Sequence, residues 1–202
     1  MPPVVSFITF PVSATFQKDR ESARADIAEV AKVDGIVGTY VGLQVEEEGA
    51  KHGYLISTWE SVEKLKAFRA SHGEKFAGIL NKLASGEIQR YSFIGSSDKI
   101  PEPAFHSPVT ELIVGKPKAG SSGDAFKAAA LKMSDALNAK GHACAIGEDI
   151  DGSGAYLLAA GWSSSKEHWD EIAKHGDITT INDEIKSIAD ITVTHVSLEK
   201  RT

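Results

Sequence analysis

The stretch TWESVEKLKAFRASHG, residues 58–73, decides the fold, because a similar stretch, GWSSSKEHWDEIAKHG, occupies residues 161–176. In both stretches a tryptophan, Trp59 or Trp162, ends an apolar run, and a helical pattern follows that ends in His-Gly. The identities are few, but their order and spacing persist on either side of the two stretches. We therefore interpret the chain as an internal duplication.

Both copies contain the same predicted elements in the same order. Each begins with an alternating strand and a helix, continues with two strands joined by a turn, and ends with a long helix and a closing strand. The predicted segments are 4–10, 19–32, 33–48, 52–59, 61–83 and 88–93 in the first copy, and 110–116, 124–139, 142–150, 155–162, 164–187 and 190–198 in the second. This β-α-β-β-α-β order is the ferredoxin-like arrangement, an α+β class with helices on one face of an antiparallel sheet.

A proline-rich segment separates the two copies. Residues 96–108 contain three prolines and no helical or strand period, so we predict an extended linker there. The repeats are then 1–95 and 109–202. Because the strands that end in tryptophan are apolar on both faces, the second face of each sheet must also be covered.

Composition excludes several classes of protein. With a net charge of -6 and no basic stripe, the chain does not fit nucleic-acid binding. It has one cysteine, Cys144, which fits a reducing compartment, and we expect that residue to be a small core side chain. No signal peptide and no apolar run long enough for a membrane span is present, so we expect a cytoplasmic protein that does not bind membranes.

The strand ending in Trp59, the following Glu60-Ser-Val-Glu63 and the histidine further on resemble the dimeric α+β barrel superfamily. The antibiotic-biosynthesis-monooxygenase-like and stress-responsive A/B barrel families are the most similar. The resemblance implies an intrachain pseudo-dimer in which two ferredoxin-like repeats form one barrel, with further homodimerisation open. It also implies a small apolar or aromatic ligand and, in many members, chemistry without a cofactor.

His72 is the first catalytic candidate. Apolar residues recur at three- and four-residue steps in the helix predicted at 61–83, and His72 falls within that buried stripe. Its imidazole is suited to general acid or base catalysis; the alternative is a core histidine that hydrogen-bonds a backbone carbonyl. Gly73 offers a point at which the helix could break. In related cyclases a tyrosine assists this histidine, but the nearest position here is Phe68, which has no hydroxyl.

His175 is the matching candidate in the second copy. His168, Glu171 and His175 lie on one helical face, which leaves a metal site conceivable, although we predict none. The alternative is a rotated helix whose buried stripe begins at Trp169 and Ile172 and leaves the histidines in solvent.

The remaining candidates are possible ligand contacts. Trp59 and Trp162 are interpreted mainly as anchors of the strand ends, and tyrosines on the strands supply polar groups to a mostly apolar pocket. Together with His168, the candidate substrate-binding residues are Tyr54, Trp59, Tyr91, Tyr156 and Trp162.

The sequence therefore favours a small-molecule enzyme, a cofactor-free monooxygenase or cyclase-like protein that acts on a phenolic or polyketide-like compound. Two alternatives stay open. One is a non-catalytic stress-responsive or ligand-binding barrel, and the other is a haem-binding or haem-degrading protein.

Overall fold

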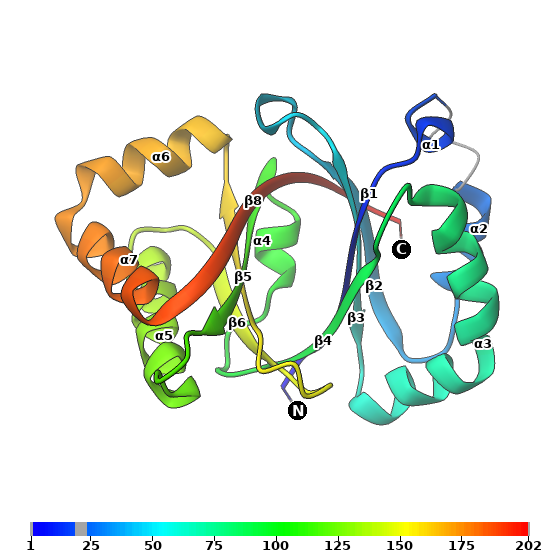
Figure 1. Cartoon of the computed structure of the whole chain (residues 1–202), viewed down its shortest axis with the longest axis horizontal. Coiled ribbons are helices and arrows are strands. Elements are labelled where there is room, and N and C mark those ends of the chain that lie inside the picture. The colour runs from blue at the N-terminus through cyan, green and yellow to red at the C-terminus, as the bar shows by residue number, and fades with distance from the viewer. Residues whose placement is uncertain (1, 19–23, 202) are drawn as a thin grey trace. The chain divides into compact units, whose positions relative to one another are not determined.

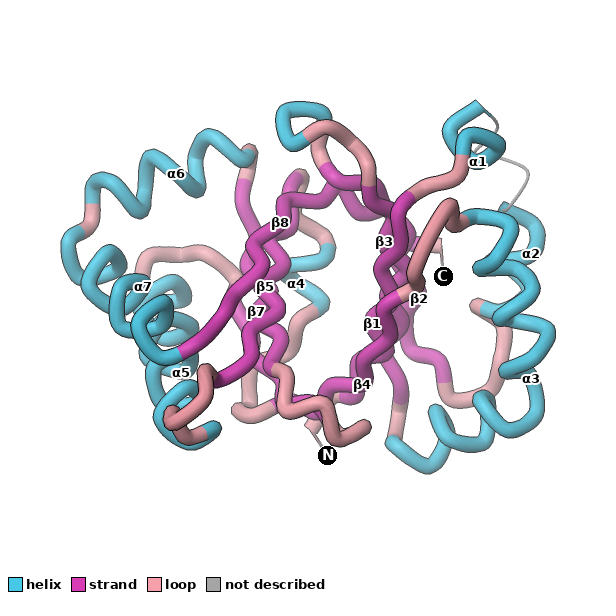
Figure 2. The backbone as a smooth tube through the Cα atoms, in the orientation of Figure 1, coloured by secondary structure: helices cyan, strands magenta, loops and turns pink. Residues whose placement is uncertain are grey.

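The computed structural model describes residues 2–18 and 24–201, and the chain divides into two compact units. Unit 1 comprises Pro3–Ser92 and the end of the chain from Glu199; unit 2 comprises Phe93–Leu198. Each unit combines helices with antiparallel strands, so the predicted α+β class is confirmed. Figure 1 labels the elements, and Figure 2 distinguishes helices from strands.

Unit 1 is built around a central strand that is buried on both faces. This strand, β3, pairs antiparallel with β1, where Val4 lies opposite Trp59, and with β2. The elements of this unit are β1 (Val4–Pro11), α1 (Ala14–Lys18), α2 (Arg24–Val30), β2 (Ile36–Gln44), the 3-10 turn η2 (Glu46–Glu48), β3 (His52–Trp59), α3 (Val62–Leu83) and the start of β4 (Gln89–Gly95).

The long helix α3 covers one face of that sheet. Ser61 caps it by accepting a hydrogen bond from the Lys64 backbone N–H. Leu80 and Leu83 of α3 pack against Ile8 and Leu55 of the sheet in one apolar cluster. Burying each such side chain contributes about 1.5–3 kcal/mol, so this contact fixes the helix on the sheet.

Unit 2 repeats the order of elements. Its sheet has the antiparallel order β8-β5-β7-β6, and Phe93–Gly95 of β4 pair with β6 at the edge. The elements are α4 (Glu102–Phe105), β5 (Val109–Pro117), α5 (Gly123–Ala139), β6 (Cys144–Asp149), β7 (Tyr156–Trp162), α6 (Ser165–Lys174), α7 (Gly176–Ile188) and β8 (Ala189–Lys200). Among the described helices of both units, none is long and apolar enough to cross a membrane.

The structure differs from the predicted elements in three places. The helix predicted at 19–32 is seen only as α2, and its start, Asp19–Ala23, lies outside the described residues. The prediction of a linker without regular structure was wrong, because α4 forms there and buries Ala104 and Phe105. Helix α3 continues through Gly73, whereas the helix predicted at 164–187 breaks into α6 and α7 at His175.

Candidate functional site

The candidate site lies in unit 2 and begins with a carboxylate on its sheet. Glu111 of β5 lies opposite His195 of β8 on one side and opposite Ala160 of β7 on the other. Ala160 is small, so the Glu111 side chain has room beside it. Glu111 is 3% exposed and His195 is fully buried. Strand pairing therefore places two polar side chains next to each other on one buried face.

Helix α6 adds the third member of the site. Ser164 caps the helix by accepting a hydrogen bond from the Glu167 backbone N–H, which fixes where the helix begins. His168 then lies one turn into α6 and points at the sheet. All ten residues of α6 are described, and His168 is the only one of them that is buried. A polar side chain thus holds this helix to the sheet.

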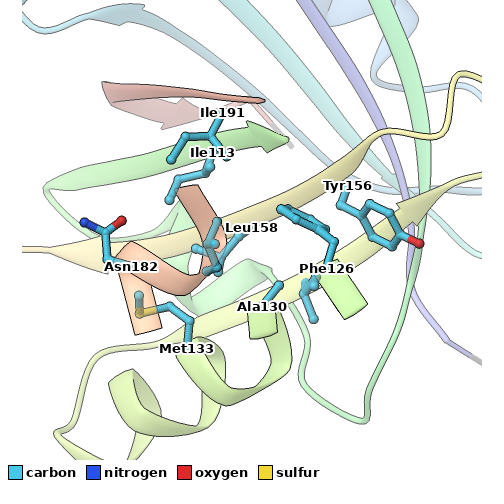
Figure 3. Close-up of a pocket in the computed structure, with 10 residues that line it drawn as sticks. Ile113, Phe126, Ala130, Met133, Tyr156, Leu158, Asn182 and Ile191 are labelled. Carbon is cyan, nitrogen blue, oxygen red and sulfur yellow. The ribbon is translucent and has the colours of Figure 1, made fainter. Parts of the chain in front are cut away.

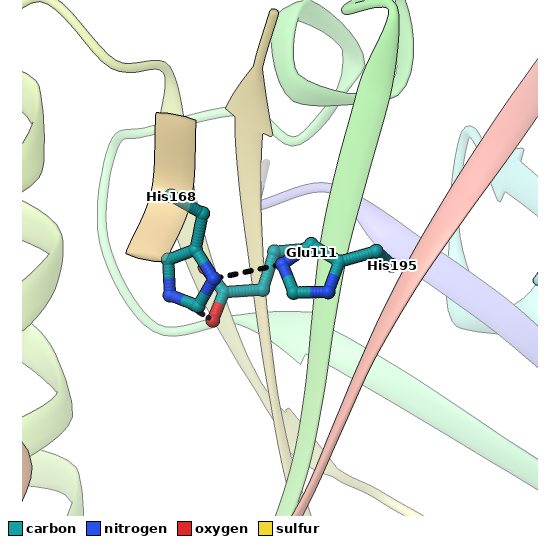
Figure 4. Close-up of side chains that lie close together, drawn as sticks. All are labelled: Glu111, His168 and His195. Atoms are coloured by element: carbon teal, nitrogen blue, oxygen red, sulfur yellow. Dashed lines mark hydrogen bonds and ion pairs between the residues drawn. The ribbon is translucent and has the colours of Figure 1, made fainter. Parts of the chain in front are cut away.

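The three side chains form a hydrogen-bonded chain, which we call the relay (Figure 4). His168 Nε2 lies 3.1 Å from Glu111 Oε1, and His168 Nδ1 lies 2.8 Å from His195 Nε2. The second carboxylate oxygen, Glu111 Oε2, accepts a hydrogen bond of 3.0 Å from Trp162 Nε1. Each ring nitrogen of His168 therefore has its own partner.

The donors and acceptors of the relay follow from the carboxylate. An ionised carboxylate only accepts hydrogen bonds, so His168 Nε2 carries a proton and donates a hydrogen bond to Glu111. His168 Nδ1 then accepts from the Nε2–H of His195. Burial, with smaller effects from His195 and His142, lowers the pKa of His168 to about 3. The His168 imidazole is thus neutral near pH 7, as this hydrogen-bond pattern requires.

Aromatic rings enclose the relay. The Trp162 ring lies 4.9 Å from the His168 ring and 4.2 Å from the His142 ring. On the outer side the Trp169 ring lies 4.4 Å from His168 and 5.7 Å from His195, although Trp169 is 52% exposed. Trp169 therefore lies between the two imidazoles and solvent.

A small apolar pocket lies on the same face of the sheet (Figure 3). It is bounded by side chains of β5, β6, β7 and β8 and of helices α5 and α7, among them Ile113, Phe126, Met133, Leu158 and Ile185. Its cavity volume is about 20 Å³. Ile113 is two residues from Glu111, so the Cα atoms of these two residues lie about 7 Å apart, at 3.3–3.4 Å per strand residue.

The geometry does not favour a metal ion at the relay. One donor atom from each of Glu111, His168 and His195 lies within 4.8 Å of the others. However, Glu111 and His195 contact different nitrogens of the His168 ring, so the donors do not converge on one point. The arrangement is that of a hydrogen-bonded chain.

The comparisons with known proteins support the fold but do not show the function. No protein-family model matches the chain, and no curated protein matches it. A proposed monooxygenase from Lactobacillus acidophilus matches with a TM-score of 0.66 and 14% identity, covering 100% of this chain and 95% of its own. A proposed monooxygenase from Fusobacterium nucleatum matches with a TM-score of 0.71 and 10% identity, covering 98% and 94%.

An anthrone oxidase-like protein also matches, with a TM-score of 0.70 and 10% identity over 99% of this chain and 93% of that protein. The chain shares the fold of these three solved structures. This confirms the resemblance that the two tryptophan-containing stretches indicated. At these identities the likeness concerns the fold alone, and the chemistry of this α+β barrel protein has to be argued from its own residues.

Unit 1 of the α+β barrel protein lacks the relay at corresponding positions. Ser61 and Ser164 cap equivalent helices, so His168 corresponds to Leu65. Val4 and Val109 lie opposite the two strand-end tryptophans, so Glu111 corresponds to Ser6. The aligned closing strands match His195 with Ser92. The titratable set therefore belongs to unit 2.

The structure places His72 differently from the sequence prediction. His72 was expected in the buried stripe of α3, which is wrong, since its side chain is exposed. Residues 69–75, in the middle of α3, contain no buried side chain, because only the two ends of the helix pack closely on the sheet. The His72 ring stacks on the outer side of Phe68 at 5.5 Å and contacts the Ser71 hydroxyl. Its catalytic role stays a prediction.

His175 and His168 lie in different environments, although both were predicted on one helical face. His175 lies at the break between α6 and α7, where its Nε2 pairs with Glu171 Oε2 at 2.8 Å. His168 instead turns inward to Glu111. The face of His168, Glu171 and His175 is thus not one cluster, and the alternative of a buried Trp169 with the histidines in solvent is wrong as well. A catalytic role for His175 stays a prediction.

The other predicted contact residues divide between the units. In unit 1, Tyr54 and Tyr91 both pack against Phe7, and Trp59 packs on Phe68 at 5.2 Å. In unit 2, Tyr156 borders the apolar pocket and Trp162 donates to Glu111. Cys144 is buried, as predicted, and burial raises the pKa of its thiol, so it stays protonated.

The sequence prediction missed Glu111 and did not include His195 among the candidate site residues. A signal for Glu111 existed, because it is the one charged residue in the apolar run VTELIV. A charged side chain within a buried strand requires a partner, and that requirement points to a histidine elsewhere in the same repeat.

Proposed function

We propose that this chain is a small-molecule enzyme of the monooxygenase kind, with the relay of unit 2 as its active centre. The observation that supports the proposal most is the burial of one carboxylate and two imidazoles, hydrogen-bonded to one another, beside an apolar pocket. Burying such groups costs stability that an apolar core would not. Unit 1 fills the corresponding positions with serine and leucine, so the fold does not require the relay.

In this proposal His195 is the base. Its Nε2 is hydrogen-bonded to His168 Nδ1 at 2.8 Å, and the His195 ring takes a proton from the substrate. The imidazolium formed on His195 is then stabilised through neutral His168 by the carboxylate of Glu111. Trp162 donates a hydrogen bond to the second carboxylate oxygen, Oε2, and so fixes the orientation of the Glu111 carboxylate.

The substrate class that suits such a site is a phenol with an acidic C–H bond. The structural similarity to the anthrone oxidase-like protein favours an anthrone as the substrate. Removal of a proton from the CH₂ group gives a carbanion delocalised over the rings. Dioxygen accepts its electrons and forms a C–O bond, giving a hydroperoxide that loses water. One anthrone and one O₂ thus yield one anthraquinone and one H₂O, and the protein needs only a base and a dry site.

Access to the relay requires movement of α6. His195 is fully buried and His168 is 2% exposed, so no organic substrate reaches either ring in the closed form. Helix α6 is held by His168 and carries Trp169 on its outer side. We propose that α6 lifts at His175 to admit the substrate and that the exposed Trp169 indole stacks on its ring.

Haem does not fit this site. His195, one of the two imidazoles that could ligate the haem iron, is fully buried. Both ring nitrogens of His168 are also engaged within the relay. We therefore propose chemistry that uses no bound redox cofactor, in a cytoplasmic protein whose partner is a small apolar molecule.

Oxygen uptake with hydroxylated anthrones tests the proposed function. We expect the chelator-treated protein, without added reductant, to consume one O₂ for each quinone formed, followed with an oxygen electrode and by quinone absorbance. The control is the His52→Gln variant, which removes an exposed histidine of unit 1. Anthrone binding without any oxygen uptake would contradict the proposal and favour a non-catalytic ligand-binding barrel.

A further inference from the structure

We propose that the apolar pocket of unit 2 is a binding site for dioxygen, separate from the place where the organic substrate binds. This inference deepens the proposed function by assigning its second substrate a site of its own. It depends on three features of the pocket, namely its size, its lining and its position beside the relay.

The size of the pocket excludes the organic substrate. A cavity of about 20 Å³ has room for a single molecule about as large as water. An aromatic ring needs a cavity of roughly 150 Å³, the size at which an apolar cavity binds benzene. Only a diatomic molecule or a single water therefore fits the pocket in this form.

The lining favours an apolar occupant over water. Aliphatic and aromatic side chains such as Ile113, Leu158 and Ile185 form most of the wall. The polar groups are Asn182 and the Tyr156 hydroxyl, which lie at opposite ends of the labelled residues, with the hydroxyl pointing outward (Figure 3). A buried water needs two to four polar partners, so water is disfavoured here. Dioxygen needs none.

The position of the pocket connects it with the relay. Ile113 and Glu111 lie on the same strand and the same face, with their Cα atoms about 7 Å apart, so the gas would be stored beside the relay. The walls come from four strands and two helices of one unit. A gas held there would be close to a carbanion formed at His195 without competing with the substrate for space.

Dissolved oxygen itself is the probe, because it is paramagnetic and broadens the NMR signals of nearby methyl groups. In protein with labelled methyl groups under oxygen pressure, we expect the signals of Ile113, Met133 and Ile185 to broaden severalfold more than those of Ile79 and Leu80. Ile79 and Leu80 are as buried as Met133 and Ile185, but they belong to the core of unit 1. Equal broadening of the two sets would overturn the site and leave a simple packing void.

A filled pocket provides the second test. Ala130 of α5 lines the pocket and is 1% exposed, so Ala130→Leu should abolish the excess broadening; Ala130→Val is the milder variant if Leu prevents folding. Ala128→Leu is the matched control, because Ala128 is exposed on the same helix. Unchanged broadening in a folded Ala130 variant would contradict the proposal.

The oxygen-binding site and the oxygenase activity can fail separately. Excess broadening without oxygen uptake on any anthrone would remove the proposed function and keep the gas site. Oxygen uptake without excess broadening would remove the gas site and keep the proposed function. If both hold, filling the pocket should raise the KM for O₂ severalfold and leave the KM for the anthrone unchanged.

Discussion

Glu111→Ser should destabilise the protein by about 2–6 kcal/mol, because two buried donors lose their acceptor and each unsatisfied buried group costs about 1–3 kcal/mol. The variant leaves Trp162 Nε1 and His168 Nε2 without their acceptor in a buried site. The free energy of unfolding, from urea titrations of the whole chain, measures the loss. Glu148→Ser is the control, since Glu148 is partly exposed and its ion pair with Lys127 is worth about 1 kcal/mol or less.

The triple variant Glu111→Ser, His168→Leu and His195→Ser gives unit 2 the residues of unit 1. We expect it to be more stable than the single Glu111→Ser variant, because no buried titratable group is left without its partner. The Trp162 N–H then lacks its acceptor. Unit 1 tolerates the same situation, since Trp59 Nε1 has no hydrogen-bond partner among the described residues. A triple variant as unstable as the sum of its single changes would show that the three side chains do not act as one unit.

Glu111→Gln should lower kcat for oxygen uptake by about 10²–10⁴-fold, the range over which general base catalysis contributes. Glutamine keeps the shape of the side chain but not its charge, so the imidazolium on His195 loses its stabilisation. Trp169, the residue proposed to stack on the anthrone, is unchanged, so the KM for the anthrone should change far less than kcat. His52→Gln is the control.

A Glu111→Gln variant with the wild-type kcat would remove the relay from the mechanism. The same assay on His72→Gln and His175→Gln tests the two histidines that the sequence singled out. Only a loss comparable with that of Glu111→Gln would give either of them a catalytic role.

Local signals made much of the fold predictable. Ser61 and Ser164 mark helix starts through their caps, and the apolar runs ending in Trp59 and Trp162 mark the central strands. These signals depend on neighbours in the chain, so one sequence was enough to order the elements. The repeat then indicated the superfamily, which the comparisons confirm at the level of fold.

The relay depends on contacts that no local pattern determines. Glu111 meets His195 only through the register of β5 against β8, which the sequence does not state. On α6, His168 and Trp169 are adjacent and differ by about 100° around the helix, so a small error in its rotation exchanges the buried side chain with the exposed one. The prediction that His72 is buried was wrong for a related reason. The middle of α3, residues 69–75, contains no buried side chain, and a helical pattern alone does not show this.

The ¹⁵N NMR spectrum of the imidazole rings tests the relay most directly. We expect His168 to show one tautomer, with the proton on Nε2 and none on Nδ1, and to stay neutral down to about pH 5, well below the ordinary titration of histidine. His195 should show its Nε2 proton in the hydrogen bond to His168. A His168 ring that averages between tautomers and titrates near its ordinary pKa would contradict the relay, and with it the proposed active centre.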